Sequence, residues 1–580
     1  MINKFTAMTT FFWLACLLVT SQAAPTPVTS KVVSDPQRSS NGIHLPLKRH
    51  SKASRTSTGI SRRGDVTTSA GIGDDEDVGY FVQMQIGKTV VELALDTGSS
   101  DIWVVSVDCQ EDICHTGLPL YPPETFQPAN LPIRINFGDS VSGSHVAGEI
   151  GTDTIILAGM EIQGQYFASI NETNNNILDF HAVGLFGLGF PTERQVTFVF
   201  VYLKFFKTFK FSSVVFAELF KRQFPNDTSL PSTFVPVINE SSLVPENSTP
   251  SSSVAETPDD LLNSFGLEGP LMARLSQDVL ASPQFTLTLE REKFDVGGQE
   301  GLLSIGELPS GVNNDSLTWV EVRRYTADEG GIVSDTEVYP IGWEVPIDDV
   351  FIDGQLLPLS TLSPNISLTA LIDSGNSLIR GPSDVVAALN TILTGTPASN
   401  IINCSIPHTL EFQIGGKMFP IDPRDFVTQT LSGELDTCTI NVVSTDPPSP
   451  GFLFSWSLGD QLFKSALISF YFGNLTHPSV DPPRIGFLST VPPDADDQYL
   501  KALENAEQNG DSLPAFLTDA PSPTISVFTT ILAPSSTPIA SSSLLSTVGD
   551  QSTVGAVSRK TKERLPGVLF KPFRKLFHPH

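Results

Sequence analysis

Between about residue 78 and about residue 491 the apolar residues are arranged as in β-strands. Short apolar runs, several of them alternating with polar residues, are separated by Gly, Pro, Asn and Asp, as in "GYFVQMQIG" and "QFTLTLER". A period of two places successive side chains on opposite faces of a strand. One helix is predicted in "PSDVVAALNTIL", from Pro382, because Val386, Leu389 and Leu393 share one face. We therefore expect an all-β body with few short helices.

Two adjacent stretches depart from this pattern and together form an atypical insert at 196–258. Residues 225–258 are rich in Ser, Thr and Pro, which predicts a disordered or glycosylated segment. The stretch from Val196 to Phe216 lacks Gly, Pro, Asp and Glu, and three lysines interrupt it, so it does not read as a membrane span. Our hypothesis is that residues 196–215 are a translated intron; the alternative is an aggregation-prone strand pair.

The two ends of the chain differ from the body. Residues 1–24 predict a secretory signal peptide, with Lys4 before a short apolar core and small residues near Ala23; the alternative is a buried N-terminal helix. Residues 25–63 are basic and predict a pro-segment, with Arg62 and Arg63 as one candidate processing site; the alternative is a disordered tail. Residues 492–580 read as a Ser/Thr/Pro-rich stalk and a basic tail, both expected to be disordered.

Composition and charge narrow the class of protein. A chain of 580 residues can bury a large core and form two or more lobes. The net charge of the whole chain is −28. Because both ends are basic, the excess of acidic residues lies in the body, which is more negative than the chain as a whole. So acidic a body repels nucleic acid and anionic membranes, and it suits an acidic medium.

Cysteines and glycosylation signals indicate export. Cys16 would leave with the signal peptide, and the remaining four cysteines allow three pairings. Proximity favours Cys109–Cys114 and Cys404–Cys438. We expect a secreted, extracellular protein, with attachment to a cell wall through the stalk left open. Eight Asn-x-Ser/Thr sequons predict surface glycosylation; they lie at Asn171, Asn226, Asn239, Asn247, Asn314, Asn365, Asn403 and Asn474.

A repeated segment suggests the chemistry. "ALDTGSSDIWVV" (94–105) and "ALIDSGNSLIRGP" (370–382) each set an aspartate in an apolar run, followed by a small hydroxyl residue and a glycine. One such segment is compatible with an ordinary turn, whereas two indicate related lobes that each present one carboxylate. If Asp96 and Asp373 meet across a cleft, they share one proton. The ionised oxygen can then activate a water molecule while the protonated partner polarises a peptide carbonyl, with neither a metal ion nor a cofactor.

The residues after each aspartate fit this role. The glycine permits a tight turn, the preceding hydroxyl residue can bond to backbone groups of the other loop, and the third residue can donate to the outer carboxylate oxygen. These support residues are Thr97, Gly98, Ser99, Ser374, Gly375 and Asn376.

"DTGSSDIWV" and "DSGNSLIRGP" strongly resemble the active-site segments of pepsin-like aspartic proteases, especially the secreted fungal members. "INFGDS" (135–140) is similar to the family's flap, and "GLFGLGFP" (184–191) and "WSLGDQLF" (456–463) to the segments that brace the two loops. The resemblance implies a bilobal double-β-barrel body at 64–491, with an N-lobe at about 78–310 and a C-lobe at about 311–491. It also matches the two cysteine pairs, and it places Phe137, Gly138, Asp139 and Trp103 at the flap and substrate cleft.

Three residues depart from the family pattern. Phe137 stands where the flap usually carries tyrosine, so we expect weaker flap closure or altered specificity. Asn376 replaces the usual Thr or Ser, and Ser457 interrupts the apolar pair expected before Gly459.

The resulting expectation is a secreted acid endopeptidase, made as a zymogen. Its substrates would be polypeptides bound extended, its pro-segment would act as inhibitor, and we expect a monomer. One alternative is a catalytically weak or inactive protease-like binding protein. A glycoside hydrolase with paired acids is another, which the duplicated loops do not suit.

Overall fold

The computed structural model describes residues 68–71, 73–75, 79–137, 144–191, 269–289, 301–334, 336–362, 367–431, 433–445, 453–513, 517–518 and 529–531. The chain divides into two units, Met1–Ala533 and Pro534–His580, and every described residue belongs to the first. Several predicted features lie outside the described residues: the signal peptide, the pro-segment at 25–63, the insert at 196–258 and the flap residues Gly138 and Asp139.

The first lobe is built on a ten-stranded sheet with the order β27-β2-β3-β4-β9-β5-β8-β7-β6, and β28 pairs with β8. Because β3 also pairs with β7, the path from β3 through β4, β9, β5, β8 and β7 closes into a barrel. The barrel and its flanking hairpin strand consist of β3 (Gly79–Ile86), β4 (Thr89–Asp96), β5 (Ile102–Val105), β6 (Gln127–Phe137), β7 (Ser144–Leu157), β8 (Met160–Thr173) and β9 (Gly184–Gly187).

The second lobe repeats part of this plan in a five-stranded sheet with the order β13-β16-β24-β17-β23. Its strands are β13 (Glu344–Pro346), β16 (Thr369–Ile372), β17 (Ile379–Gly381), β23 (Val442–Ser444) and β24 (Trp456–Leu458). A four-stranded sheet comprises β14 (Asp349–Ile352), β15 (Gln355–Leu356), β19 (Leu410–Ile414) and β20 (Lys417–Pro420), and a three-stranded sheet comprises β18 (Ile401–Ile402), β21 (Val427–Leu431) and β22 (Glu434–Ile440).

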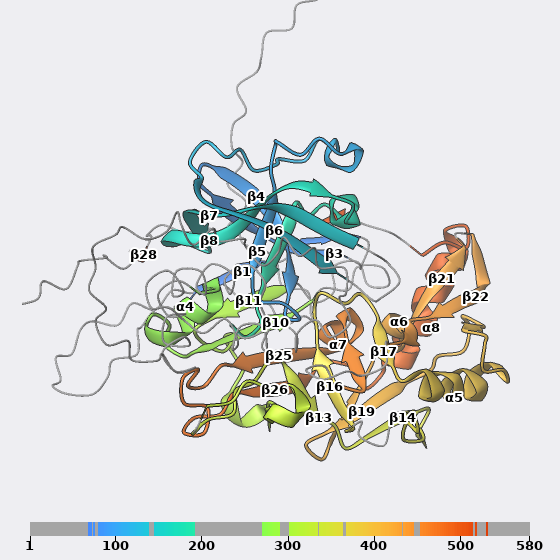
Figure 1. Cartoon of the computed structure of the whole chain (residues 1–580). Helices are drawn as coiled ribbons and strands as arrows, with labels where there is room; N and C mark the ends of the chain where they lie inside the picture. The colour runs from blue at the N-terminus through green and yellow to red at the C-terminus, as the bar shows by residue number, and fades with distance from the viewer. Residues whose placement is uncertain are drawn as a thin grey trace, which may run out of the picture. The chain divides into compact units, whose positions relative to one another are not determined.

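A six-stranded sheet joins chain segments from both predicted lobes, with the order β1-β11-β10-β25-β26-β12 (Figure 1). At its centre every residue of β10 and β25 is buried, and Phe285 stacks on Phe470 at a ring distance of 4.7 Å. The strands are β1 (Thr68–Gly71), β10 (Gln284–Thr288), β11 (Leu302–Ile305), β12 (Thr318–Glu321), β25 (Ala466–Tyr471) and β26 (Arg484–Ser489). The mostly β architecture confirms the predicted pepsin-like fold.

Short helices complete the described part of the chain: α4 (Leu271–Asp278), α5 (Ser383–Thr394), α6 (Pro423–Phe426), α7 (Asp460–Ser465) and α8 (Ala495–Gln508). The helix predicted from Pro382 is α5, whose Val386 and Leu389 are buried and whose end is marked by Gly395 with φ of 77°. Among the described residues, no helix has the length and apolarity needed to cross a membrane.

The folded chain continues past residue 491, where the composition predicts a disordered stalk. Tyr499, Leu503 and Ala506 are buried on α8, and the Tyr499 hydroxyl donates to the Cys404 carbonyl oxygen at 2.6 Å. Spacings of four and three residues put these side chains on one helical face, which explains why the helix packs. Farther on, β27 (Leu517–Thr518) pairs with β2 (Gly73–Asp75), and β28 (Thr529–Ile531) pairs with β8.

Candidate active site

Each aspartate lies at the end of an equivalent strand. β4 ends at Asp96 and runs parallel to β9, while β16 ends directly before Asp373 and runs parallel to β24. The Leu188 amide donates to the Asp96 carbonyl oxygen at 2.7 Å, and the Asp373 amide donates to the Leu458 carbonyl oxygen at 3.0 Å. The segments 184–191 and 456–463 therefore brace the two loops in corresponding positions.

The two carboxyl groups meet, as the repeated motif predicts. Asp96 is buried and Asp373 is half-buried, and the two side chains interact directly. A Cβ atom on Gly98 would lie 2.4 Å from Asp373 Oδ1, and a Cβ atom on Gly375 would lie 2.4 Å from Asp96 Oδ1. Each glycine is therefore needed because the opposite carboxylate occupies the space of a side chain.

Thr97 and Ser374 hold the two loops together through reciprocal bonds. Thr97 Oγ1 donates to the Ile372 carbonyl oxygen at 2.7 Å and accepts from the Ser374 amide at 2.9 Å. Ser374 Oγ donates to the Leu95 carbonyl oxygen at 3.0 Å and accepts from the Thr97 amide at 3.1 Å. Four buried bonds thus cross between the loops, in the manner the sequence predicts.

The carboxylate of Asp96 accepts more hydrogen bonds from its own loop than the carboxylate of Asp373 does. Asp96 accepts from Ser99 Oγ at 2.5 Å and from the Gly98 amide at 2.8 Å. Asp373 accepts from the Gly375 amide at 3.0 Å. The sequence analysis also expects Asn376 to donate to the outer oxygen of Asp373, and here the structure differs.

The Asn376 amide nitrogen instead donates to Ser457 Oγ at 3.0 Å. The cause is the residue type at position 457, where a serine in place of an apolar residue offers a buried acceptor next to the loop. The two departures from the family pattern are therefore partners of each other.

The environment makes both carboxyl groups reluctant to ionise. Burial raises the pKa of Asp96, and the hydrogen bonds from Ser99 and Gly98 oppose that rise. Burial also raises the pKa of Asp373, and the negative charge of Asp96 raises it further, while the Gly375 amide and the Arg380 charge oppose the rise. Two carboxyl groups in such close contact share one proton over a wide pH range, so one can act as base and the other as acid.

Trp343 is a site-supporting residue that the sequence analysis did not identify. Its Nε1 donates to the Leu188 carbonyl oxygen at 3.1 Å, and its carbonyl oxygen accepts from the Ile372 amide at 2.9 Å. Because the Leu188 amide bonds to Asp96, a continuous hydrogen-bonded path links the backbone at Asp96 with the residue before Asp373. The only available signal was a tryptophan within "YPIGWEVP".

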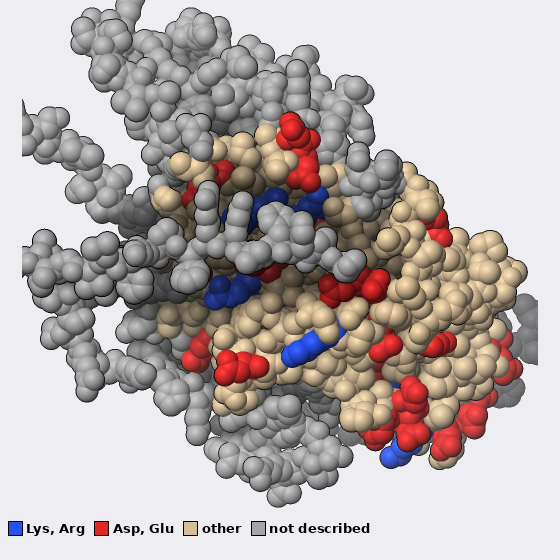
Figure 2. All heavy atoms as spheres, turned by 90° about the horizontal axis from the view of Figure 1, so that it is seen from below, with Lys and Arg blue, Asp and Glu red and all other residues tan. Residues whose placement is uncertain are grey.

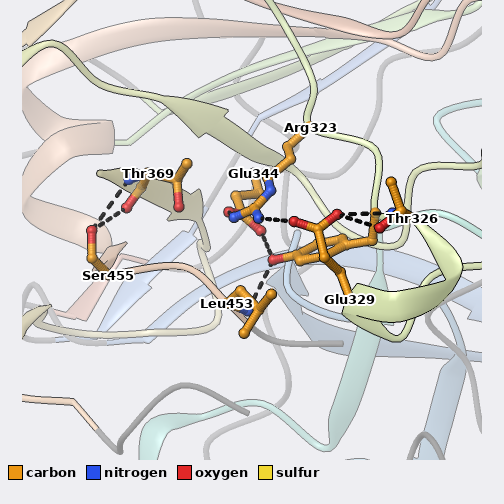
Figure 3. Close-up of polar contacts among 8 residues, drawn as sticks. Arg323, Thr326, Glu329, Glu344, Thr369, Leu453 and Ser455 are labelled. Atoms are coloured by element: carbon orange, nitrogen blue, oxygen red, sulfur yellow. Dashed lines mark hydrogen bonds and ion pairs between the residues drawn. The ribbon is translucent and has the colours of Figure 1, made fainter. Parts of the chain in front are cut away.

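An ion pair to a buried glutamate holds β13, the strand that directly follows Trp343. Glu344 lies opposite Leu371 in the β13–β16 register, and its side chain is 3% exposed. Arg323 donates to Glu344 at 3.0 Å and to Glu329 at 2.8 Å, and the hydroxyl of Tyr325 donates to Glu344 (Figure 3). Replacing Arg323 would leave the buried Glu344 carboxylate without its ion-pair partner, whereas Arg323 would still be paired with Glu329 if Glu344 were replaced.

A second contact anchors the start of β16. Figure 3 also shows Ser455 against Thr369: Ser455 Oγ accepts from the Thr369 amide at 3.2 Å and donates to its carbonyl oxygen at 3.0 Å. Both ends of the short strand before Asp373 are therefore fixed.

The remaining predicted residues have different outcomes. Trp103 is 2% exposed on β5, in the core of the first lobe. Phe137 is the last residue of β6 and pairs with Ser144 of β7. These two antiparallel strands flank the segment in which the sequence analysis predicts the flap. The disulfides Cys109–Cys114 and Cys404–Cys438 are both present, with Cα–Cα distances of 6.1 and 5.1 Å.

Comparison with known proteins identifies the same family over most of this body. A family model described as eukaryotic aspartyl protease matches residues 79–233 and 263–477. The chain is 25% identical to pepsin A of Rhinolophus ferrumequinum over 411 residues, which covers 69% of this chain and 80% of the relative. It is 23% identical to cathepsin E-A of Xenopus laevis over 480 residues, which covers 78% of this chain and 94% of the relative. Both relatives are animal proteins, and the likeness to secreted fungal members stays a prediction.

Proposed function

This chain belongs to the eukaryotic aspartyl protease family, whose members are pepsin-like, and we propose that it is an endopeptidase that hydrolyses polypeptides at acidic pH. One observation carries the proposal: the carboxyl groups of Asp96 and Asp373 interact directly at the junction of two equivalent loops, each packed against the glycine of the opposite loop. Pepsin A, gastricsin and cathepsin E among the relatives support the reaction class.

The proposed mechanism uses the unequal environments of the two carboxyl groups. Asp96, which accepts two strong hydrogen bonds, is the ionised base and takes a proton from a bound water molecule. Asp373 is the protonated acid and gives its proton to the peptide carbonyl oxygen, so that a gem-diol forms. As the carbon–nitrogen bond breaks, the amine takes the proton from Asp96. A gem-diol hydroxyl then returns a proton to Asp373, which restores the pair.

We propose that the substrate binds as an extended strand beneath the β6–β7 hairpin. An extended peptide can pair its backbone with such a hairpin and place alternate side chains in subsites. The proposal gives Phe137 an apolar contact with the substrate, and it assigns Gly138 and Asp139 to the flap tip. Because phenylalanine has no hydroxyl, we expect subsite preferences that differ from those of relatives with tyrosine at this position.

Export and activation are further parts of the proposal. A signal peptide at 1–24 and a pro-segment at 25–63 would make the chain a secreted zymogen, and two disulfides suit an oxidising compartment. Cleavage after Arg63 would leave β1, which begins at Thr68, in the six-stranded sheet. Acidic side chains occur over much of the face shown in Figure 2 and lie most densely at its lower right. A basic pro-segment would be attracted to such a surface and released as carboxylates become protonated.

The proposed organisation is an N-lobe at about 78–310 and a C-lobe at about 311–491, to which the structure adds α8. We also keep the hypothesis that residues 196–215 are a translated intron. Peptide mass spectrometry of the secreted protein tests it, because recovery of that stretch contradicts it.

The function is tested with the full chain secreted from a eukaryotic host. We expect cleavage of casein between about pH 3 and pH 5, inhibition by a statine-type peptide, and loss of cleavage in D96N and D373N. The exposed residue Asp436 on β22 offers a matched control, and D436N should cleave like the unchanged protein. Full turnover in D96N or D373N would contradict the proposal, and binding of peptides without cleavage would favour the protease-like binding protein.

A further inference from the structure

In both catalytic loops the amide of the glycine donates to the aspartate two residues before it, but the loops differ in the third residue after the aspartate. In the first loop Ser99 Oγ lies 2.5 Å from Asp96 Oδ2 and donates to it. In the second loop the equivalent side chain is Asn376, whose nitrogen points to Ser457 Oγ at 3.0 Å. One carboxylate therefore receives a side-chain donor from its own loop, and the other loop directs its donor elsewhere.

Asn376 is held in this orientation by every polar atom of its side chain. Its oxygen accepts from Arg380 Nε at 3.1 Å and from the Leu378 amide at 3.2 Å, while its nitrogen bonds to Ser457. Asn376 is 8% exposed and Ser457 is 5% exposed, so water competes little for these bonds. Turning the amide toward Asp373 would break several buried hydrogen bonds for one, which disfavours that rotamer.

The charged groups that act on Asp373 come from two elements. Asp96, at the end of β4, disfavours a second negative charge, and Arg380, on β17, favours it. Burial adds to the effect of Asp96, and the net result is a raised pKa for Asp373. A hydrogen bond donated to a carboxylate stabilises its ionised form, so a donor from residue 376 would act in the opposite direction.

We propose that the Asn376–Ser457 bond is a positioning contact that keeps the shared proton on Asp373 and thereby extends the activity of the enzyme toward neutral pH. The inference rests on the proposed function, because it concerns the acid member of the same pair. Asn376 acts here through Asp373, because its own side chain bonds to Ser457, Arg380 and the Leu378 amide. The pH limit of the reaction is thus set partly by two residues that both differ from the family pattern.

The test compares N376T with N376V, two side chains of nearly equal shape, either of which loses the bond to Ser457. Only threonine can donate a hydroxyl hydrogen bond to Asp373. We expect N376T to lower the upper apparent pKa of the kcat/KM profile by about one unit, the order expected for one charge-assisted bond. N376V should keep the upper limb of the unchanged protein. Equal profiles for N376T and N376V would overturn the proposal.

A second measurement does not depend on cleavage, which separates this inference from the proposed function. A carboxyl with a raised folded-state pKa stabilises the fold fully below its unfolded-state pKa, and that stability is lost as the pH rises through the folded value. We expect the urea midpoint of N376T to fall less between about pH 4 and pH 7 than that of N376V. The same decline in both variants would overturn the inference even if the protein cleaves casein. The expected difference would support it even if no cleavage is found.

Discussion

Replacing Thr97 by valine removes one half of the reciprocal lock between the catalytic loops without changing the shape of the side chain. The Ile372 carbonyl oxygen, 2.7 Å away, loses its donor, and the Ser374 amide, 2.9 Å away, loses its acceptor. Both partners are buried. A buried polar group left without a partner costs about 1–3 kcal/mol, so we expect T97V to lower the free energy of unfolding by about 2–4 kcal/mol.

The measurement is urea-induced unfolding followed by tryptophan fluorescence, with casein cleavage measured in parallel. We expect kcat to fall at least about tenfold, because a small displacement of positioned groups has a large effect on rate. Thr391 offers a matched control, since it is exposed on α5 and its hydroxyl donates to the Ala387 carbonyl oxygen. T391V should change the free energy of unfolding by less than about 0.5 kcal/mol. A T97V protein as stable as T391V would refute the argument that the lock joins the loops.

Three further outcomes are expected. G98A should lower kcat about a hundredfold, measured on casein, because its Cβ would lie 2.4 Å from Asp373 Oδ1; wild-type turnover would contradict the close approach of the loops. Burial raises the pKa of both Asp96 and Asp373, so ionising them destabilises the fold at neutral pH. D373N should therefore melt at a higher temperature than the unchanged protein at neutral pH, and the difference in melting temperature should disappear below about pH 4. A difference that does not change with pH would contradict the raised pKa. W343F should lose about 1–2 kcal/mol of stability and lower kcat more than it changes KM, because the Leu188 carbonyl oxygen loses its donor; a change in KM alone would contradict a positioning role.

The elements that sequence patterns predict best are those whose signal is local. The two Asp-Gly loops, their braces and α5 each carry their information within about a dozen residues, through residue type and spacing. The pairing of Asp96 with Asp373 could be inferred because the motif occurs twice. The orientation of Asn376 could not, because it depends on Ser457, which lies far along the chain and reaches the loop through the pairing of β24 with both β16 and β17.

Two other features were hidden for different physical reasons. Trp343 links the lobes through a bond to the carbonyl oxygen of Leu188, and no residue type signals a backbone acceptor in advance. Helix α8 follows "VPPD" and precedes the Ser/Thr/Pro-rich stalk, so regional composition concealed the helical spacing of Tyr499, Leu503 and Ala506.

That terminal helix sets a practical limit on how far the gene can be shortened for expression. Stopping at Val491, as composition advises, would delete Tyr499 and strip the Cys404 carbonyl of its phenolic partner beside the second disulfide. The apolar surface that α8 covers would then be exposed, which would promote aggregation during secretion rather than impair turnover directly. Ending the coding region beyond Leu513 keeps α8 and the buried Leu513 in place, so that this apolar surface stays covered.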